Sequence, residues 1–162
     1  MKKKAQESIG MSFGVIFAIF LIIIFLLVAF FTIKHFLDIE KTSKVGLFYR
    51  DFQESVDSAF ISQSTEFNFE INLPPKIEKI CFANLSAKIT GNQADYKELE
   101  NYDIYEANVF LIPSQFAESM EYKLINHLNI TKIIENKNPY CIPVSQNILI
   151  KKDFYDRLVS VE

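Results

Sequence analysis

The sequence predicts an α+β protein in which one apolar N-terminal helix extends into an amphipathic helix that packs on a small antiparallel β-sheet domain. Three observations lead to this prediction. No charged side chain occurs from Ile9 to Ile33. Apolar residues then recur at helical spacing as far as Phe60. From Thr65 the apolar period changes to two, which is the period of a half-buried strand.

The uncharged run is long and apolar enough to cross a bilayer. Between Val15 and Phe31 every residue except Ala18 and Ala29 is Leu, Ile, Val or Phe. Such residues favour membrane insertion by roughly 0.3 to 0.6 kcal/mol each, which sums to roughly 4 to 9 kcal/mol. A bilayer core requires about 20 helical residues, so we predict a transmembrane helix over 9–33. The run lacks the polar stripe of a surface helix and exceeds the apolar length of a cleaved secretory signal.

Positive charges flank the predicted span on both sides. A basic leader over 1–8 precedes it, and further lysines follow it, so the two sides are nearly equal by the positive-inside rule. Asp38 and Glu40 are interspersed among the lysines of the second side, although acidic residues contribute little to the rule. We therefore expect a cytoplasmic N-terminus and an extracytoplasmic C-terminal domain. The lysines compared are Lys2, Lys3 and Lys4 before the span and Lys34, Lys41 and Lys44 after it.

Two further features favour an extracytoplasmic C-terminal domain. Asn84 and Asn129 each begin an N-glycosylation sequon, Asn-Leu-Ser and Asn-Ile-Thr respectively. Cys81 and Cys141 can pair in an oxidising compartment, which would close a loop of about 60 residues and stabilise the fold by about 3 to 4 kcal/mol. The alternatives are chance sequons in an Asn-rich chain and buried cysteines that act as small apolar side chains.

Beyond the span, an amphipathic juxtamembrane helix is predicted over 34–62. Charged residues, among them Arg50 and Asp57, fall mostly off its apolar stripe. Charged residues interrupt the stripe at Glu40, Lys41 and Lys44. Thr42-Ser43 followed by Gly46 lowers helix propensity, which predicts a bend or short break near 40–46. The stripe consists of Val45, Phe48, Phe52, Val56 and Phe60.

The remaining residues, 63–162, predict one β-rich domain. Parallel strands would need helical crossovers of a dozen or more residues, and too few helical segments are present, so the sheet should be antiparallel. The expected elements are a strand over 65–73, a second strand or hairpin over 77–90, a short helix or acidic loop over 93–102, a strand over 108–112, another helix or strand, and strands at 140–142, 147–150 and 158–161.

No catalytic, metal-binding or cofactor-binding pattern emerges from the sequence. His35 and His127 have no Cys, His or carboxylate partner at metal-ligand spacing. Beyond the span the glycines are Gly46 and Gly91, which cannot form a phosphate-cradling loop. The net charge of −3 opposes nucleic acid binding. We therefore predict a non-enzyme without cofactor, metal or small-molecule substrate, with the lipid bilayer as a partner; an enzyme with dispersed catalytic groups is the least favoured class.

Lys3-Lys4-Ala5-Gln6-Glu7-Ser8, directly before the apolar run, resembles the class III signal peptide of archaeal type IV pilin-like proteins. The resemblance implies cleavage between Ala5 and Gln6, with Ser8 matching a Ser that many members carry. It covers about a dozen residues. The fifth mature position is Gly10, where the family has Glu, and this departure puts filament assembly in question because that carboxylate is thought to meet the amino terminus of a neighbouring subunit.

The resemblance implies a structural or assembly component of the envelope that associates with copies of itself or with other pilin-like subunits. Gly10 and Gly14 also have the small-xxx-small spacing that lets membrane helices approach closely, and we hypothesise that they face another copy. The alternative is a signal-anchored binding module that does not polymerise.

Overall fold

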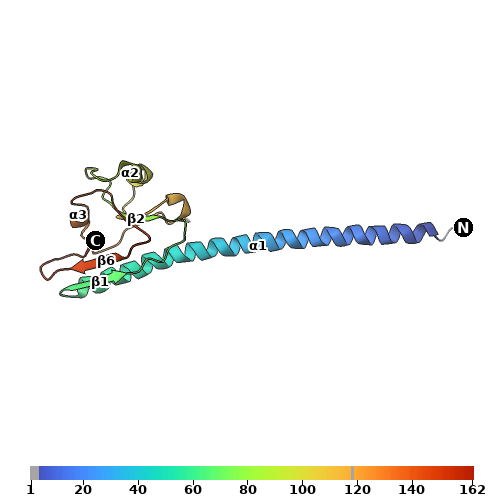
Figure 1. The fold of residues 1–162 in the computed structure, drawn as a ribbon, viewed down its shortest axis with the longest axis horizontal. Helices are drawn as coiled ribbons and strands as arrows, with labels where there is room; N and C mark the ends of the chain where they lie inside the picture. The colour runs from blue at the N-terminus through green and yellow to red at the C-terminus, as the bar shows by residue number, and fades with distance from the viewer. Residues whose placement is uncertain (1–3, 118) are drawn as a thin grey trace. The chain divides into compact units, whose positions relative to one another are not determined.

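A computed structural model describes the backbone of residues 4–117 and 119–162 and the side chains of 13–117 and 119–162. The chain forms two compact units, Met1–Ile39 and Glu40–Glu162. Helix α1 (Lys4–Ile61; Figure 1) belongs to the first unit in its N-terminal part and to the second in its C-terminal part. We call the second unit the head. The fold class is the predicted α+β.

In the first unit, α1 is an apolar helix whose large side chains from Phe13 to Ile39 are exposed. It is long and apolar enough to cross a membrane. Thr32, inside the apolar run, donates its hydroxyl proton to the Val28 carbonyl at 2.8 Å, so this polar group is satisfied within the helix. The predicted span is therefore helical over its described residues. Met1 to Lys3 of the expected leader lie outside the described residues.

In the head, the C-terminal part of α1 buries the predicted stripe. Val45, Phe52 and Val56 are fully buried, Phe48 nearly so, and Phe60 is half-buried. Residues 40–46 are helical, so the predicted alternative of a short break in the helix does not occur. The other alternative, a bend of the helix near these residues, stays a prediction. Helix continuity is supported by the Lys44–Glu40 ion pair one turn apart, 2.8 Å between Nζ and Oε1.

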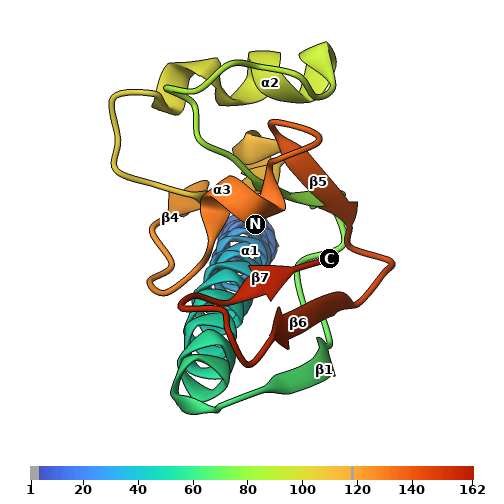
Figure 2. The same cartoon turned by 90° about the vertical axis from the view of Figure 1, so that its left-hand side faces the viewer.

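The strands of the head form two antiparallel sheets rather than the single sheet predicted. The first has the order β1-β6-β7, with β1 (Thr65–Phe69), β6 (Ile148–Lys152) and β7 (Ser160–Val161). The second has the order β4-β3-β2-β5, with β2 (Lys79–Phe82), β3 (Val109–Ile112), β4 (Tyr122–Lys123) and β5 (Tyr140–Pro143). Figure 2 shows β1, β6 and β7 beside the C-terminal part of α1.

Short helical segments connect these strands. The predicted helix near residue 93 is present as α2, which Asn92 caps by accepting a hydrogen bond from the Ala94 amide at 2.8 Å. The segments are α2 (Gln93–Leu99), the 3₁₀ turns η1 (Glu100–Tyr102) and η2 (Ser114–Phe116), and α3 (Ile130–Ile133).

Phe52 joins the helix to both sheets. Its ring centroid lies 5.2 Å from that of Phe69 in β1 and 6.0 Å from that of Phe82 in β2. Phe48, one turn earlier, stacks on Phe52 at 5.9 Å and also meets Phe69. These aromatic contacts occupy the centre of the main core, where each ring buries a large apolar area.

Two of the predicted strands end earlier than expected. Residues 70–73 are not part of β1, and 87–90 form a loop instead of a strand. In that loop, backbone groups are satisfied by Asn138, which is only 2% exposed. The side-chain Nδ2 of Asn138 donates to the backbone carbonyls of Asn84 and Lys88 at 2.7 and 3.3 Å. Its backbone carbonyl accepts from the Thr90 and Gly91 amides.

Replacing Phe52 with Ala should lower the free energy of unfolding of the head by about 3 to 5 kcal/mol, because it removes the ring that joins both sheets to α1. Urea denaturation of the detergent-solubilised full chain, followed by tyrosine fluorescence, measures this change. The matched control Ile61→Ala, at a position 83% exposed, should change stability by less than about 0.5 kcal/mol. Equal effects of both substitutions would contradict this account of the core.

Candidate functional site

A pocket of about 530 Å³ lies in the head between the C-terminal part of α1 and the segment around β4. This volume is within the range of small-ligand pockets, roughly 300 to 1,000 Å³. One wall comes from successive turns of the helix and the other from residues 119–123. The lining residues are Gly46, Tyr49, Arg50, Gln53, Glu54, Ser119, Met120, Tyr122 and Lys123.

Helical spacing places the residues of the α1 wall of the pocket next to one another. Gly46, Tyr49 and Gln53 follow one another at steps of three and four, so they share one face of α1. A Cβ at Gly46 would make ordinary van der Waals contact with Met120, 3.9 Å from its Cε and 4.0 Å from its Sδ. The Met120 thioether therefore lies next to this turn of the helix and forms an apolar side of the pocket.

Tyr49 carries an unpaired buried hydroxyl. The residue is 4% exposed, and its Oη has no hydrogen-bond partner within the described part of the chain. Burial raises the pKa of Tyr49 well above its usual value, and the negative charge of Glu121 raises it further. The phenol is thus held in its protonated form. An unmade hydrogen bond of this kind costs about 1 to 3 kcal/mol.

Arg50, which lines the pocket together with Glu54 and Lys123, is engaged with acids of its own helix. Arg50 donates from Nε and Nη2 to Asp51 Oδ1 at 3.0 and 2.8 Å, and its Nε lies 3.8 Å from Glu54 Oε1. The hydrogen bond to Asp51 is the main reason why the pKa of Arg50 is raised. The cation at the rim is therefore largely neutralised by acids of its own helix.

An aromatic cluster borders the pocket through Tyr122. Its ring stacks on Tyr105, with centroids 4.6 Å apart and planes 23° apart, and lies 5.2 Å from the Tyr102 ring. Burial and then the charge and hydrogen bond of Tyr105 raise the pKa of Tyr122. Tyr102 also contacts Phe110 of β3, which anchors the cluster to the sheet. The rings are consequently held in fixed positions next to the pocket.

A second polar constellation lies further along the same helix. His127 Nδ1 is 2.9 Å from Asp57 Oδ1, and its ring stacks on Phe60 with centroids 3.8 Å apart and planes 6° apart. Gln53 accepts a hydrogen bond from the Asn126 amide at 2.9 Å. The carboxylate partner comes from a residue 70 positions away, so the sequence spacing did not reveal it. These contacts fasten the 126–127 loop to α1, and His127 adopts a left-handed φ of 66° there.

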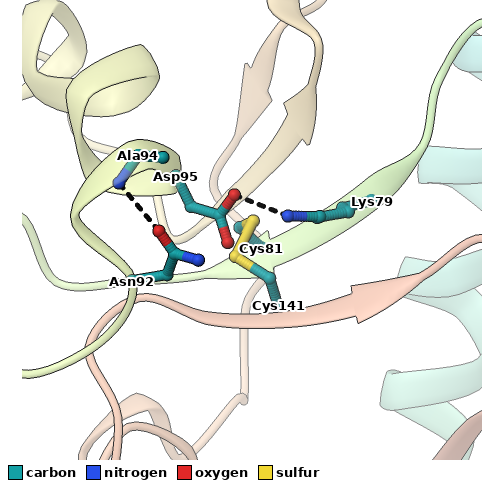
Figure 3. Close-up of a disulfide and its surroundings, with 6 residues drawn as sticks. All are labelled: Lys79, Cys81, Asn92, Ala94, Asp95 and Cys141. Atoms are coloured by element: carbon teal, nitrogen blue, oxygen red, sulfur yellow. Dashed lines mark hydrogen bonds and ion pairs between the residues drawn. A yellow bond between two sulfur atoms is a disulfide. The ribbon is translucent and has the colours of Figure 1, made fainter.

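Cys81 and Cys141 form a disulfide in the structure (Figure 3). They face each other in register on the neighbouring strands β2 and β5. Cys81 belongs to a small core beneath α2 together with Leu99 and Phe110. Beside the bond, the Lys79 ammonium lies 2.7 Å from the Asp95 carboxylate of α2. The disulfide joins the edge strand β5 to β2, and the ion pair joins α2 to β2.

The sequon asparagines occupy turns and caps. Asn84 is exposed and accepts a hydrogen bond from the Ser86 amide at 3.1 Å. Asn129 is half-buried and caps α3 by accepting from the Lys132 amide at 3.2 Å. In both cases the side-chain oxygen is engaged by the backbone, which leaves the amide nitrogen as the atom to be glycosylated.

The predicted residues of the first unit are less informative. A Cβ added to Gly14 would meet nothing within 4 Å, so this position presents open helix surface. The side chains of Ala5 and Gln6, and the surroundings of Gly10, lie outside the described residues. Among the described residues, no group of three or more His, Cys, Asp or Glu is placed to hold a metal ion.

No protein-family model, curated protein or solved structure matches the chain. Functional inference therefore rests on the apolar helix, the disulfide-bonded head and the pocket. The pocket residues were not singled out by the sequence, because Tyr49 next to Phe48 looks like one more member of the apolar stripe. Tyr49 lies three residues after Gly46, on the same face of the helix. A glycine inside a helical pattern is the sequence signal that could have drawn attention to this face.

The raised pKa of Tyr49 predicts a stability change at alkaline pH. The unfolded chain ionises this tyrosine near pH 10, whereas the folded head keeps it protonated. Its contribution to stability is thus fully present below pH 10 and is lost above it, by up to about 1.4 kcal/mol per pH unit. Tyr49→Phe should remove this part of the slope.

Urea denaturation at several pH values between about 9 and 11 measures the slope. The control Tyr155→Phe, at a position 93% exposed, should keep the slope of the unmodified protein. Parallel pH profiles for the unmodified chain and Tyr49→Phe would contradict the assigned environment of this hydroxyl.

Proposed function

We propose that this protein is a single-pass membrane-anchored component of a cell envelope, and more specifically a pilin-like structural or assembly subunit. In this proposal the apolar part of α1 spans the bilayer with its N-terminus in the cytoplasm, and the head is displayed on the extracytoplasmic side. The observation that carries the proposal is the joining, within one helix, of an apolar segment and a stripe buried in a folded head.

Exposure of the apolar segment supports the membrane anchor. Every described Leu, Ile, Val and Phe between Phe13 and Ile39 is exposed. A continuous apolar surface of this extent is unfavourable in water and marks a site of membrane or protein contact. Because no charge interrupts it from Ile9 to Ile33, a bilayer is the environment that matches it over the required length.

Two features of the head support an extracytoplasmic location. The Cys81–Cys141 disulfide is a bond that persists in oxidising compartments and is rare in the cytosol. Asn84, which begins a sequon, is exposed and therefore open to glycosylation. The lysines on the two sides of the span are too evenly distributed to decide the orientation alone.

The pilin-like part of the proposal rests on two independent supports. One is the resemblance of Lys3 to Ser8 to a class III signal peptide. The other is the layout in which an apolar helix continues into an amphipathic part that packs on antiparallel sheets. Gly10 in place of the family's Glu argues against tight filament packing, so a minor or assembly component fits better than a major subunit.

A non-polymerising binding module is the second candidate function. The observation that favours it is the head pocket of about 530 Å³, whose volume is within the range of small-ligand sites. In both functions the anchor and the orientation are the same. Cleavage of the leader separates them, because a plain signal anchor retains its lysines.

The intact mass of the protein extracted from its native membrane tests the pilin-like proposal. We expect a chain that begins at Gln6, because the proposed peptidase cuts after Ala5. Substituting Ala5 with Leu, which alters only the cut position, should yield the uncleaved mass. A native chain that retains Lys2 to Lys4 would exclude a pilin-like subunit and favour the binding module.

Orientation is tested by labelling intact cells with a membrane-impermeant maleimide. A cysteine introduced as Tyr155→Cys, at an exposed position of the loop after β6, should be labelled without permeabilisation if the head is outside. The unmodified chain is the control, since both of its cysteines are in the disulfide. Labelling of the variant only after lysis would reverse the proposed orientation.

A further inference from the structure

Two exposed aromatic side chains project from the loop between β6 and β7. Phe154 is 63% exposed and Tyr155 is 93% exposed, and their rings meet edge to face with centroids 5.2 Å apart. We call this pair the knob. The loop that carries it starts beside the end of α1, where Lys152 binds the last carbonyls of the helix (Figure 1). Exposed aromatic residues are typical anchors of protein interfaces, so the knob marks a contact surface.

Ion pairs hold the loop that carries the knob. Lys132 of α3 lies 2.8 Å from Asp156 Oδ2 and 4.0 Å from Asp153 Oδ2. Lys151 of β6 lies 3.9 Å from the other carboxylate oxygen of Asp153. The Asp156 amide also donates to the Asp153 carbonyl at 2.9 Å, which closes a turn around the two aromatic residues. The knob is therefore presented in a defined conformation, and little conformational entropy is lost when a partner binds it.

The head pocket has the size and the chemistry to receive the knob. A cavity of about 150 Å³ holds one benzene ring, so two aromatic rings need about 300 Å³, and the pocket has about 530 Å³. Met120 forms one apolar side, and a thioether beside an aromatic ring is a favourable contact. The Tyr122 ring, held by its stacking on Tyr105, offers an aromatic surface. Both rings of the knob thus find matching partners in the pocket.

Charges of both signs surround the pocket. Arg50 is bound to Asp51 and lies near Glu54, so these three groups largely neutralise one another. Lys123 also lines the pocket, and Glu121 directly precedes the lining residue Tyr122 in the sequence. Neither Lys123 nor Glu121 forms an ion pair within the described part of the chain. One cation and one acid at the rim are therefore left for a partner.

Charges next to the knob complement those at the pocket. Two lysines bind the acids of the loop, Glu66 pairs with one of these lysines at 3.8 Å, and Arg157 forms no ion pair among the residues that the structure describes. The cations and acids are thus equal in number, so the loop has no net attraction to an anionic lipid surface. In a docked pair of heads Arg157 can meet Glu121. Lys123 can in turn meet Asp153, which its own lysines contact only at 3.9 and 4.0 Å.

We propose that the knob of one copy of this chain docks into the head pocket of a second copy, with Met120 and Tyr122 as its main contacts. The match in size, apolar chemistry and charge between two surfaces of the same chain points to a second copy as the partner. Because the two surfaces differ, a docked pair keeps one knob and one pocket free, and the contact can repeat along a row of heads. The inference rests on the proposed function, in which copies displayed on the same side of a membrane associate.

The docking contact is weak by itself. Two aromatic side chains bury about 300 to 500 Å², which is less than the surface of about 800 Å² that each partner buries in a standard interface. Docked and free heads therefore exchange, and the loop stays accessible to reagents. Anchoring in one membrane raises the effective concentration of the heads, which makes a weak contact sufficient for association.

Thiol cross-linking between two variants of the full chain tests the contact. One detergent-solubilised preparation carries Lys123→Cys at the pocket rim, the other carries Arg157→Cys beside the knob, and a mass tag on one chain identifies heterodimers. The mixture is treated with a short bismaleimide, to which the bonded native cysteines do not react. We expect heterodimers to form about tenfold faster than with Ser86→Cys in place of Arg157→Cys, because docking raises the local thiol concentration. Ser86 is an exposed control position outside both surfaces.

Further substitutions show which surfaces meet. Replacing both Phe154 and Tyr155 with Ala in the Arg157→Cys chain removes the anchors and should slow cross-linking about tenfold. Gly46→Leu in the Lys123→Cys chain places a side chain against Met120 and should slow it similarly by filling the pocket. The control Ile61→Ala, at an exposed apolar position outside the knob, should leave the rate unchanged. The knob residues are exposed, so their substitution tests the contact without disturbing the core of the head.

Three results would overturn the proposal. These are equal rates with Arg157→Cys and Ser86→Cys, an unchanged rate after loss of the two aromatic side chains, and an unchanged rate in Gly46→Leu when circular dichroism shows a folded head. The measurement uses purified protein, so neither leader cleavage nor membrane orientation affects it. Failure of the docking contact is thus distinguishable from failure of the proposed function, which the intact mass and the maleimide labelling of cells measure.

Discussion

Contact of the Phe52 ring with Phe69 on one side and Phe82 on the other is the interaction on which the head depends. The first sheet has three strands and the second four. The buried stripe of α1 supplies an apolar surface that contacts both of them. The same residues that continue the apolar helix thus contribute to the main core in which the two sheets meet.

Polar contacts fix the ends of this arrangement. Lys152 of β6 donates from Nζ to the carbonyls of Phe60 and Ser62 at 3.0 and 2.5 Å, where α1 ends and its last carbonyls lack helical partners. His127 and Asp57 join the helix to the loop before α3. The strand β4 comprises only two residues, Tyr122 and Lys123. Both of them line the pocket on the side that faces α1.

The sequence predicted the elements that depend on periodicity and missed those that depend on distant partners. The stripe from Val45 to Val56 and the strands β3 and β6 follow from local patterns. The loop at 87–90 looked like a strand, but Asn138, far along the chain, satisfies its backbone. The break expected at 40–46 is absent because packing of Val45 outweighs weak local propensity. The pocket was not foreseen, since an unpaired hydroxyl at Tyr49 becomes visible only when every neighbour is in place.

The disulfide has a consequence for incomplete forms of the chain. Cys81 and Cys141 are 60 residues apart, and β5, which carries Cys141, follows both β2 and β3 in the sequence. Because a chain is synthesised from its N-terminus, Cys81 has no disulfide partner until Cys141 has been added. A chain that ends before β5 therefore keeps a free thiol at Cys81. A thiol reagent thus distinguishes truncated heads from complete ones, in which both cysteines are bonded.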